Sequence, residues 1–233
     1  MNLDQFRETL EKAGITVFSG GDAARIVGKP PGYTKLFLYR LAKKGKILRV
    51  QQGIYCLPGA DEMEIASRLT YPSYVSFLSA LSFHRLSTQI PIAIQVASAR
   101  QKTPVSFGNT RIEFIKLKRQ AFFGFRRYGN AIVAEPEKAI IDGLHVPGHL
   151  PLSEALHALK DETLRTSALC DYAQQFASAI VKRRLGFLLE KAGREPGETL
   201  KGRPTRYALL SPLLRKKGKK DRKWMLIVNE VLE

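Results

Sequence analysis

Apolar positions in the first part of the chain recur at helical spacing and end at glycines. A first helix is predicted for residues 2–13, and Gly14 ends it; its apolar residues at helical spacing are Leu3, Phe6, Leu10 and Ala13. A short second helix is predicted where alanines and aliphatic residues precede Gly28. The pattern therefore predicts two short helices before the most informative segment of the chain begins.

A third helix followed by a tight hairpin is predicted next. The tandem prolines of residues 29–32 predict a turn, because proline cannot continue a helix. Residues 33–44 then form the helix, and Gly45 is a suitable stop because glycine adopts positive φ without strain. Residues 47–57 alternate as a hairpin whose tip lies at residues 51–53. The face of the helix predicted to be buried contains Phe37, Leu38, Leu41 and Thr34.

Residues 58–60, Pro-Gly-Ala, resemble a linker, and the rest of the chain mixes strands with helices. Strands are predicted at 91–97, 111–117 and 129–134, and helices at 61–69, 74–85, 135–144, 152–159, 167–176 and 180–192. The fold class expected is α+β. We expect a winged helix-turn-helix domain at 1–58, followed at 59–233 by a mixed α/β domain with a small sheet and a helical C-terminal part.

Three helices and a hairpin in this order are typical of a winged helix, which places its third helix in the major groove of DNA. Basic and aromatic side chains on the outward face could then contact phosphates or base edges, and the hairpin would lie along the backbone or the minor groove. The predicted DNA-binding residues are Lys29, Tyr33, Thr34, Lys35, Tyr39, Arg40, Lys43, Lys44, Arg49, Gln51 and Gln52. A solvated basic helix face is the alternative, since a basic helix alone is weak evidence.

The charge of the chain agrees with a polyanionic partner. Its 38 Lys and Arg outnumber 21 Asp and Glu, giving a formal net charge of +17. No apolar run approaches the ~18 residues that span a bilayer, and the N-terminus lacks a signal peptide's apolar stretch. Cys56 and Cys170 lack a metal-ligand pattern, so we expect reduced thiols, a cytoplasmic protein and no cofactor.

Two further basic groups suggest a second nucleic-acid surface. Arg126 and Arg127 follow a run of phenylalanines, a mixture that could stack bases, although a buried strand with a polar edge explains it as well. The other group is Lys182, Arg183 and Arg184. Residues 215–223 are also densely basic. Whether these groups contact nucleic acid stays open at this point.

An enzyme is the alternative class of function. Glu135, Glu137 and Asp142 lie on or beside one predicted helix and could share a metal. A proline-started acidic helix N-terminus, with Asp142 paired to a basic residue, explains them better. His145 and His149 have ligand-like spacing, but Pro147 and Gly148 between them break the helix. We therefore predict no catalytic residues and no metal site.

The segment from Arg40 to Tyr55, Arg-Leu-Ala-Lys-Lys-Gly-Lys-Ile-Leu-Arg-Val-Gln-Gln-Gly-Ile-Tyr, resembles the winged helix of the AbiEi antitoxins of type IV (abortive infection) toxin–antitoxin systems. Later segments resemble the same family, at residues 72–81, 89–91, 134–142, 184–190 and 223–224. The resemblance implies a transcriptional repressor that binds inverted-repeat operator DNA, as a monomer or dimer, upstream of its own operon. It also implies a functional partner, a co-encoded nucleotidyltransferase-like toxin. The basic C-terminal half fits equally a stand-alone regulator that has no toxin.

Overall fold

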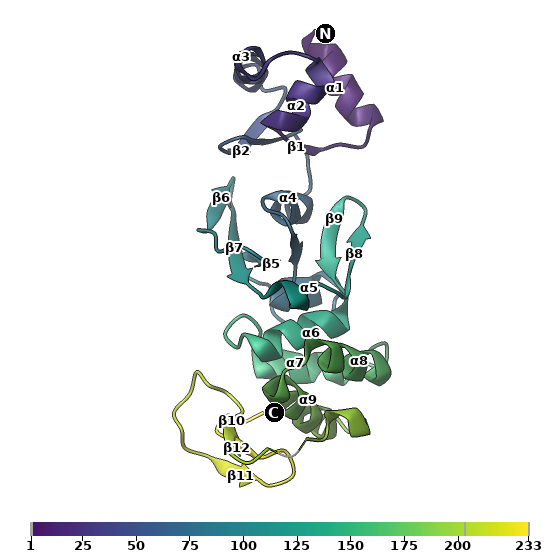
Figure 1. Ribbon diagram of the computed structural model, residues 1–233, viewed down its shortest axis with the longest axis vertical. Helices are drawn as coiled ribbons and strands as arrows, with labels where there is room; N and C mark the ends of the chain where they lie inside the picture. The colour runs from purple at the N-terminus through teal and green to yellow at the C-terminus, as the bar shows by residue number, and fades with distance from the viewer. Residues whose placement is uncertain (1, 203, 233) are drawn as a thin grey trace.

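The computed structural model describes residues 2–202 and 204–232. The described chain is elongated, with a small helical unit at the N-terminal end, a six-stranded sheet in the middle, and a small sheet at the C-terminal end (Figure 1). Helices pack between the two sheets. The mixed α+β class predicted from the sequence is thus confirmed.

The N-terminal unit contains the predicted three helices and hairpin. Its elements are α1 (Leu3–Lys12), β1 (Val17–Ser19), α2 (Gly20–Val27), α3 (Pro31–Lys43), β2 (Leu48–Gln51) and β3 (Ile54–Cys56). The three strands form an antiparallel sheet in the order β1-β3-β2. This is the arrangement of a winged helix, in which β2 and β3 form the wing.

The third helix begins earlier than the sequence predicts. Pro30 is its N-cap and Pro31 its first residue, so residues 31 and 32 are helical rather than part of a turn. The prediction was wrong because the first turn of a helix needs no backbone N–H from proline, whose φ is already suitable there. Gly45 does adopt a positive φ of 66°, just beyond the end of the helix.

Aromatic side chains hold the N-terminal unit together. The ring of Phe6 in α1 meets Phe37 of α3 edge-on, with centroids 5.4 Å apart, and Phe18 of β1 at 5.7 Å. Leu10 and Leu41 are fully buried beside them. Because α1, β1 and α3 all contribute to one hydrophobic cluster, the orientation of α3 is fixed by packing on its inner face.

The second unit is built on a mixed six-stranded sheet in the order β6-β7-β5-β4-β9-β8. Its strands are β4 (Ser73–Val75), β5 (Ile94–Ser98), β6 (Val105–Phe107), β7 (Thr110–Lys116), β8 (Phe125–Tyr128) and β9 (Ala131–Ala134). β5 is parallel to β7 and β4 to β9, and the remaining pairs are antiparallel. The strands predicted near 91–97, 111–117 and 129–134 are therefore confirmed with shifted ends.

The helix predicted for residues 74–85 is partly wrong. Residues 73–75 form the central strand β4, and the helix α5 (Phe77–Phe83) starts only after Ser76. Tyr74 and Val75 are both fully buried, because a strand in the middle of a covered sheet is apolar on both faces. Such a run has no alternation, so its apolar residues matched helical spacing by coincidence.

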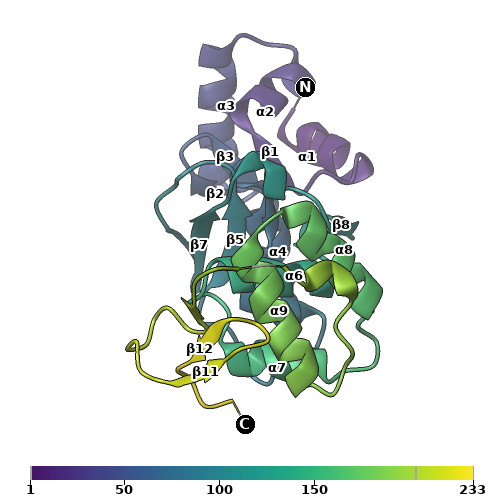
Figure 2. The ribbon, with the colours of Figure 1, turned by 60° about the horizontal axis from the view of Figure 1, so that its bottom comes forward.

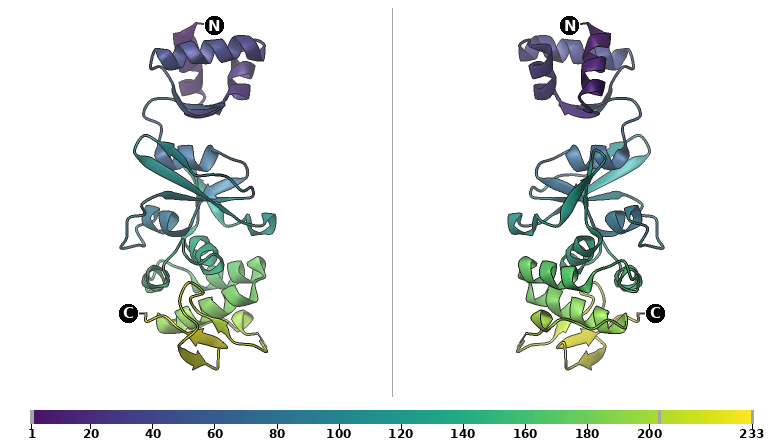
Figure 3. Two further views of the ribbon diagram at one scale, coloured as in Figure 1. Left: turned by 90° about the vertical axis from the view of Figure 1, so that its left-hand side faces the viewer. Right: turned by 90° about the vertical axis from the view of Figure 1, so that its right-hand side faces the viewer.

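Helices cover the sheet and join it to the C-terminal end (Figures 2 and 3). They are α4 (Glu62–Arg68), α6 (Pro136–His145), α7 (Leu152–Leu159), α8 (Thr166–Phe176) and α9 (Ala179–Lys191), with 3-10 turns η1 (Arg119–Ala121) and η2 (Glu198–Leu200). The last sheet has the order β10-β12-β11, formed by β10 (Ala208–Leu209), β11 (Lys219–Asp221) and β12 (Leu226–Val228).

Trp224 attaches this last sheet to α9. Its indole ring lies so close to Gly186 that a Cβ there would meet it at 2.1 Å, so only glycine fits at that position. The indole N–H donates to a carboxylate oxygen of Glu190 at 3.0 Å. A single large side chain thereby anchors a segment with few other buried apolar groups.

Few polar contacts join the N-terminal unit to the second unit. The side-chain amide of Asn130 donates to the carbonyl of Gly14 at 3.2 Å, and Thr16 donates to Glu64. Gln51 of the wing donates to the carbonyl of Leu69 at 3.4 Å. Among the described residues, no helix is both long and apolar enough to cross a membrane.

An ion pair between Lys138 and Asp142 lies at the centre of the second unit, with both side chains fully buried. Asp142 also accepts hydrogen bonds from Tyr74, at 2.9 Å, and Ser76, at 2.8 Å. Burial lowers the pKa of Lys138, and the adjacent Asp142 carboxylate opposes this shift. The ammonium also lies over the rings of Phe123 and Phe176. The group joins β4 to α6.

We expect Lys138→Ala to destabilise the chain by about 3–5 kcal/mol, because Asp142 would stay buried without its partner. Lys201→Ala is the matched control, since Lys201 pairs with Glu198 at the surface and such pairs contribute at most about 1 kcal/mol. Urea denaturation of the full chain measures both. Equal stability of the two variants would show that the buried pair is not structurally important.

Candidate nucleic-acid interface

The helix that precedes α3 is fixed by a capping box. The Ser19 hydroxyl accepts the backbone N–H of Asp22 at 3.1 Å, and the Asp22 carboxylate accepts the backbone N–H of Ser19 at 2.9 Å. Burial disfavours the charged form of Asp22, but hydrogen bonds from Ser19 and Arg25 outweigh it and lower the pKa of Asp22. Such a cap stabilises a helix by about 1 kcal/mol. The capping box therefore stabilises α2, the helix that contacts α3.

Thr34 belongs to the buried face of α3. Only 2% of its surface is exposed, and its hydroxyl donates to the carbonyls of Lys29 and Pro30. The prediction that Thr34 contacts DNA is therefore wrong, because its hydroxyl is used to close the turn between α2 and α3. Phe37, Leu38 and Leu41 are buried on the same face, as the sequence predicts.

The outward face of α3 presents the other predicted side chains to solvent. Tyr33 is 51% exposed and Tyr39 is 62% exposed. The Tyr33 ring also stacks on Phe37, with centroids 6.4 Å apart, so its orientation is partly fixed. The exposed cations of this face and of the adjoining turns are Lys29, Lys35, Arg40, Lys43 and Lys44. One side of α3 thus packs in the unit while the other combines positive charge with aromatic surface.

The wing lies beside α3. Its tip contains Gln52 and Gly53, where Gly53 adopts a φ of 78° and its carbonyl accepts the backbone N–H of Gly20 at 2.9 Å. Arg49 and Gln52 are exposed. Gln51 is half-buried, and its side-chain amide points to Leu69 of the second unit. We therefore place Arg49 and Gln52, rather than Gln51, on the accessible edge of the wing.

A groove of about 600 Å³ separates α3 from the wing. Basic and aromatic side chains from both elements line it, together with the start of α2; they include Lys35, Tyr39, Arg49, Gln52 and Tyr55. Lys35 and Arg49 bring positive charge to this concave surface from α3 and from the wing. The geometry therefore brings the third helix and the hairpin to one site.

Acidic groups do not neutralise this face. In the described part of the chain, the ion pairs of the N-terminal unit are Arg7–Glu11, Lys12–Glu8, Arg25–Asp22 and Lys46–Asp4. None of them involves Lys35, Arg40, Lys43 or Arg49. These cations are therefore free to neutralise phosphates, which is the main source of affinity in DNA binding.

Leu36 is a large apolar residue of α3 that was predicted for neither face of the helix. It is 49% exposed, although it is a large apolar side chain. Its position on a helical wheel, opposite Thr34 and Leu38, was a sufficient signal to place it outward.

The two basic groups of the proposed second surface lie on different elements. Arg126 and Arg127 are on β8, where Arg126 pairs with Glu135 and Arg127 donates to the Gly129 carbonyl at 2.8 Å. The second group, Lys182, Arg183 and Arg184, is on α9, which lies outside the six-stranded sheet that contains β8 (Figure 1). Residues 125–128 of the mixed aromatic and basic segment do form a strand, but β8 lies at the edge of the sheet and is not buried, so the alternative of a buried strand is only partly confirmed.

Arg184 is buried and cannot contribute to such a surface. Its guanidinium donates to the carbonyls of Leu144, at 2.7 Å, and Leu209, at 3.1 Å. Burial lowers its pKa to about 10. The prediction was wrong because a charge on α9 is needed to satisfy two backbone carbonyls inside the protein.

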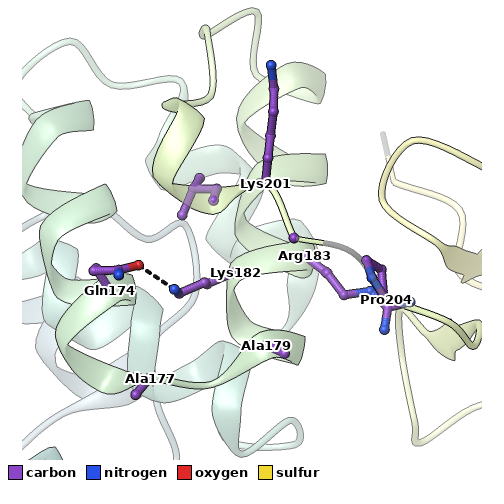
Figure 4. A pocket seen from close by; sticks show the side chains of 9 residues that line it. Gln174, Ala177, Ala179, Lys182, Arg183, Lys201 and Pro204 are labelled. Carbon is purple, nitrogen blue, oxygen red and sulfur yellow. Dashed lines mark hydrogen bonds between the residues drawn. The ribbon is translucent and has the colours of Figure 1, made fainter.

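Lys182 and Arg183 line a pocket of about 400 Å³ beside α9 (Figure 4). Lys182 reaches toward Gln174, and Lys201 extends away from the other labelled side chains. Arg183 donates to the carbonyls of Trp224, at 2.7 Å, and Arg206, at 3.3 Å. Both α9 cations therefore have partners within the chain, and the structure does not join them to the face of α3.

The carboxylates considered for catalysis also have structural partners. Glu135 is buried and accepts from Tyr172 and Arg126, whereas Glu137 pairs with Arg165. Asp142 is neutralised by Lys138, so its predicted pairing with a basic residue is confirmed. Within the described residues, no three His, Cys, Asp or Glu side chains gather as a metal site would require.

The geometry of α3 and the wing coincides with the part of the chain that matches a known family. Residues 8–58 match the family model described as transcriptional regulator, AbiEi antitoxin. The match extends from α1 to the residues just after β3, so it covers the winged helix and supports a role as a DNA-binding regulator. A comparison with curated proteins found no match.

We expect the double substitution Arg40→Ala and Lys43→Ala in α3 to weaken DNA binding and to flatten its salt dependence. If both cations contact phosphates, the negative slope of log K, where K is the association constant, against log salt concentration should become shallower by about 1.8. Fluorescence anisotropy with a labelled duplex over a range of salt concentrations measures this.

Arg7→Ala combined with Lys12→Ala is the control. It removes the same charge from α1, where both cations already pair with glutamates. A salt slope that falls equally in both double variants would contradict a specific role for α3.

Proposed function

We propose that this chain binds double-stranded DNA with α3 in the major groove and the wing along the adjacent backbone, and that it acts as a transcriptional repressor. The observation that carries the proposal is the outward face of α3, which, in the described part of the chain, exposes unpaired cations and two tyrosines and which shares a groove with the wing through Lys35 and Tyr39. The match of residues 8–58 to transcriptional regulators supports it.

The roles proposed for individual residues follow from their exposure. Lys35, Arg40 and Lys43 contact phosphates or guanine edges from α3. Arg49 and Gln52 contact the backbone from the wing, and Lys29 and Lys44 add positive charge at the two ends of α3. Tyr33 and Tyr39 offer hydroxyls to phosphates and rings to base edges. We also propose that a domain boundary lies at about residue 58, so that the winged helix is the DNA-binding part.

We further propose that the protein is the antitoxin of a type IV system and represses its own operon at inverted repeats. The description of the matched family as AbiEi antitoxin supports this, as do the resembling segments beyond residue 58. In this proposal, residues 59–233 oppose a co-encoded nucleotidyltransferase-like toxin. A stand-alone regulator is the second candidate, because the matched residues lie wholly within the winged helix.

We expect the wild-type chain to lower expression of a reporter placed behind the DNA upstream of its own gene. The variant with Arg40→Ala and Lys43→Ala should restore expression, whereas the α1 variant with Arg7→Ala and Lys12→Ala should still repress. Reporter activity at equal protein levels is the measurement. Repression that survives loss of the two α3 cations would contradict the proposed mode of binding.

The antitoxin role is tested separately from DNA binding. If a nucleotidyltransferase-like reading frame adjoins the gene, its expression alone should arrest growth, and co-expression of this chain should restore growth. Restoration should persist with residues Arg40 and Lys43 replaced, since it depends on the second unit. Failure of co-expression to restore growth would favour the stand-alone regulator.

A further inference from the structure

Three of the exposed large apolar or aromatic side chains of the described chain lie within one helix. They are Tyr33, Leu36 and Tyr39 of α3, each about half exposed or more. A single exposed leucine needs no explanation, but a group of such side chains on one face indicates a contact surface. The exposed part of α3 is therefore not simply a basic helix face.

Leu36 and Tyr39 lie in the middle of the outward face. At about 100° per residue, positions 32, 36, 39 and 43 form a stripe along α3, opposite the buried stripe through Thr34, Leu38 and Leu41. Lys35 and Arg40 flank this stripe on its two sides. Leu36 and Tyr39 thus occupy the part of the helix that would lie deepest in a groove, with Lys43 at the C-terminal end of the same stripe. Lys35 and Arg40 lie where the phosphates would be.

Gly32 is the first residue of the same stripe, at the N-terminal end of α3. A Cβ added there would meet no other atom of the chain within 4 Å, so packing inside the protein does not require glycine. Its φ is not positive either. The missing side chain instead leaves room for a partner to approach the first turn of α3 closely.

We propose that Leu36, together with Tyr39, recognises the C5-methyl groups of thymines in the major groove. This deepens the proposed function and rests on it. Thymine is the base that presents an apolar group in that groove, where apolar side chains contact it. A second copy of this chain is a poor partner for the stripe, because a two-fold contact would bring Lys35, Arg40 and Lys43 of both copies together.

The test begins with the duplexes that the full-length chain selects from a random library. In the best of them, each thymine is replaced in turn by deoxyuridine, which lacks only the methyl group. We expect one or more positions at which this replacement weakens wild-type binding about fourfold, the effect of one buried methyl group.

At those positions, Leu36→Ala should bind the thymine and deoxyuridine duplexes equally. Leu214→Ala is the matched control, since Leu214 is 47% exposed and lies in the C-terminal segment between β10 and β11, and it should retain the wild-type preference. Leu36→Ala leaves helix propensity nearly unchanged, and its circular dichroism spectrum should match that of the wild type.

Two results would overturn the proposal. One is wild-type binding that is indifferent to deoxyuridine at every position; the other is an undiminished thymine preference in Leu36→Ala. In both cases the chain still binds DNA, so the proposed function would stand. Selection of no duplex at all would reject the proposed function together with this inference.

Discussion

The second unit depends on a charge pair that has no contact with solvent. Lys138 and Asp142 are one helical turn apart on α6, and Tyr74 and Ser76 bring the central strand and the start of α5 to them. A buried charge is tolerated only when it is paired and hydrogen-bonded. The group therefore fixes the position of α6 against the sheet, and α8 and α9 pack against that helix in turn.

The N-terminal unit differs from the second unit because the cations on the outward face of α3 are exposed rather than buried. α3 is held by Phe6, Phe37 and Leu41 on one side, and Thr34 closes the turn before it. Its cations can stay unpaired since they remain in water, whereas Arg184 and Lys138 in the second unit are engaged inside the protein. The large positive charge is thus divided between structural and accessible groups, and the accessible ones on α3 carry the proposed function.

Local signals in the sequence predicted most of the N-terminal unit. Gly28, Gly45 and Gly53 each adopt the positive φ expected of a stop or a turn. Features that depend on contacts between distant parts of the chain could not be predicted from the sequence. The strand β4 is defined by its pairing with β5 and β9. The burial of Arg184 could not be inferred either, because the residues next to it in the sequence are basic. Within α3, periodicity separated the two faces and could place Leu36 on the outward one, but it did not show that the Thr34 hydroxyl would close the turn before the helix.

Lysine reactivity tests most directly whether the outward face of α3 contacts DNA. The full chain is treated with an amine-reactive reagent with and without saturating duplex, and modification at each lysine is measured by mass spectrometry. We expect DNA to protect Lys35 and Lys43, while the exposed Lys191 and Lys216 react as before. Unchanged reactivity at Lys35 and Lys43, with protection elsewhere, would contradict it.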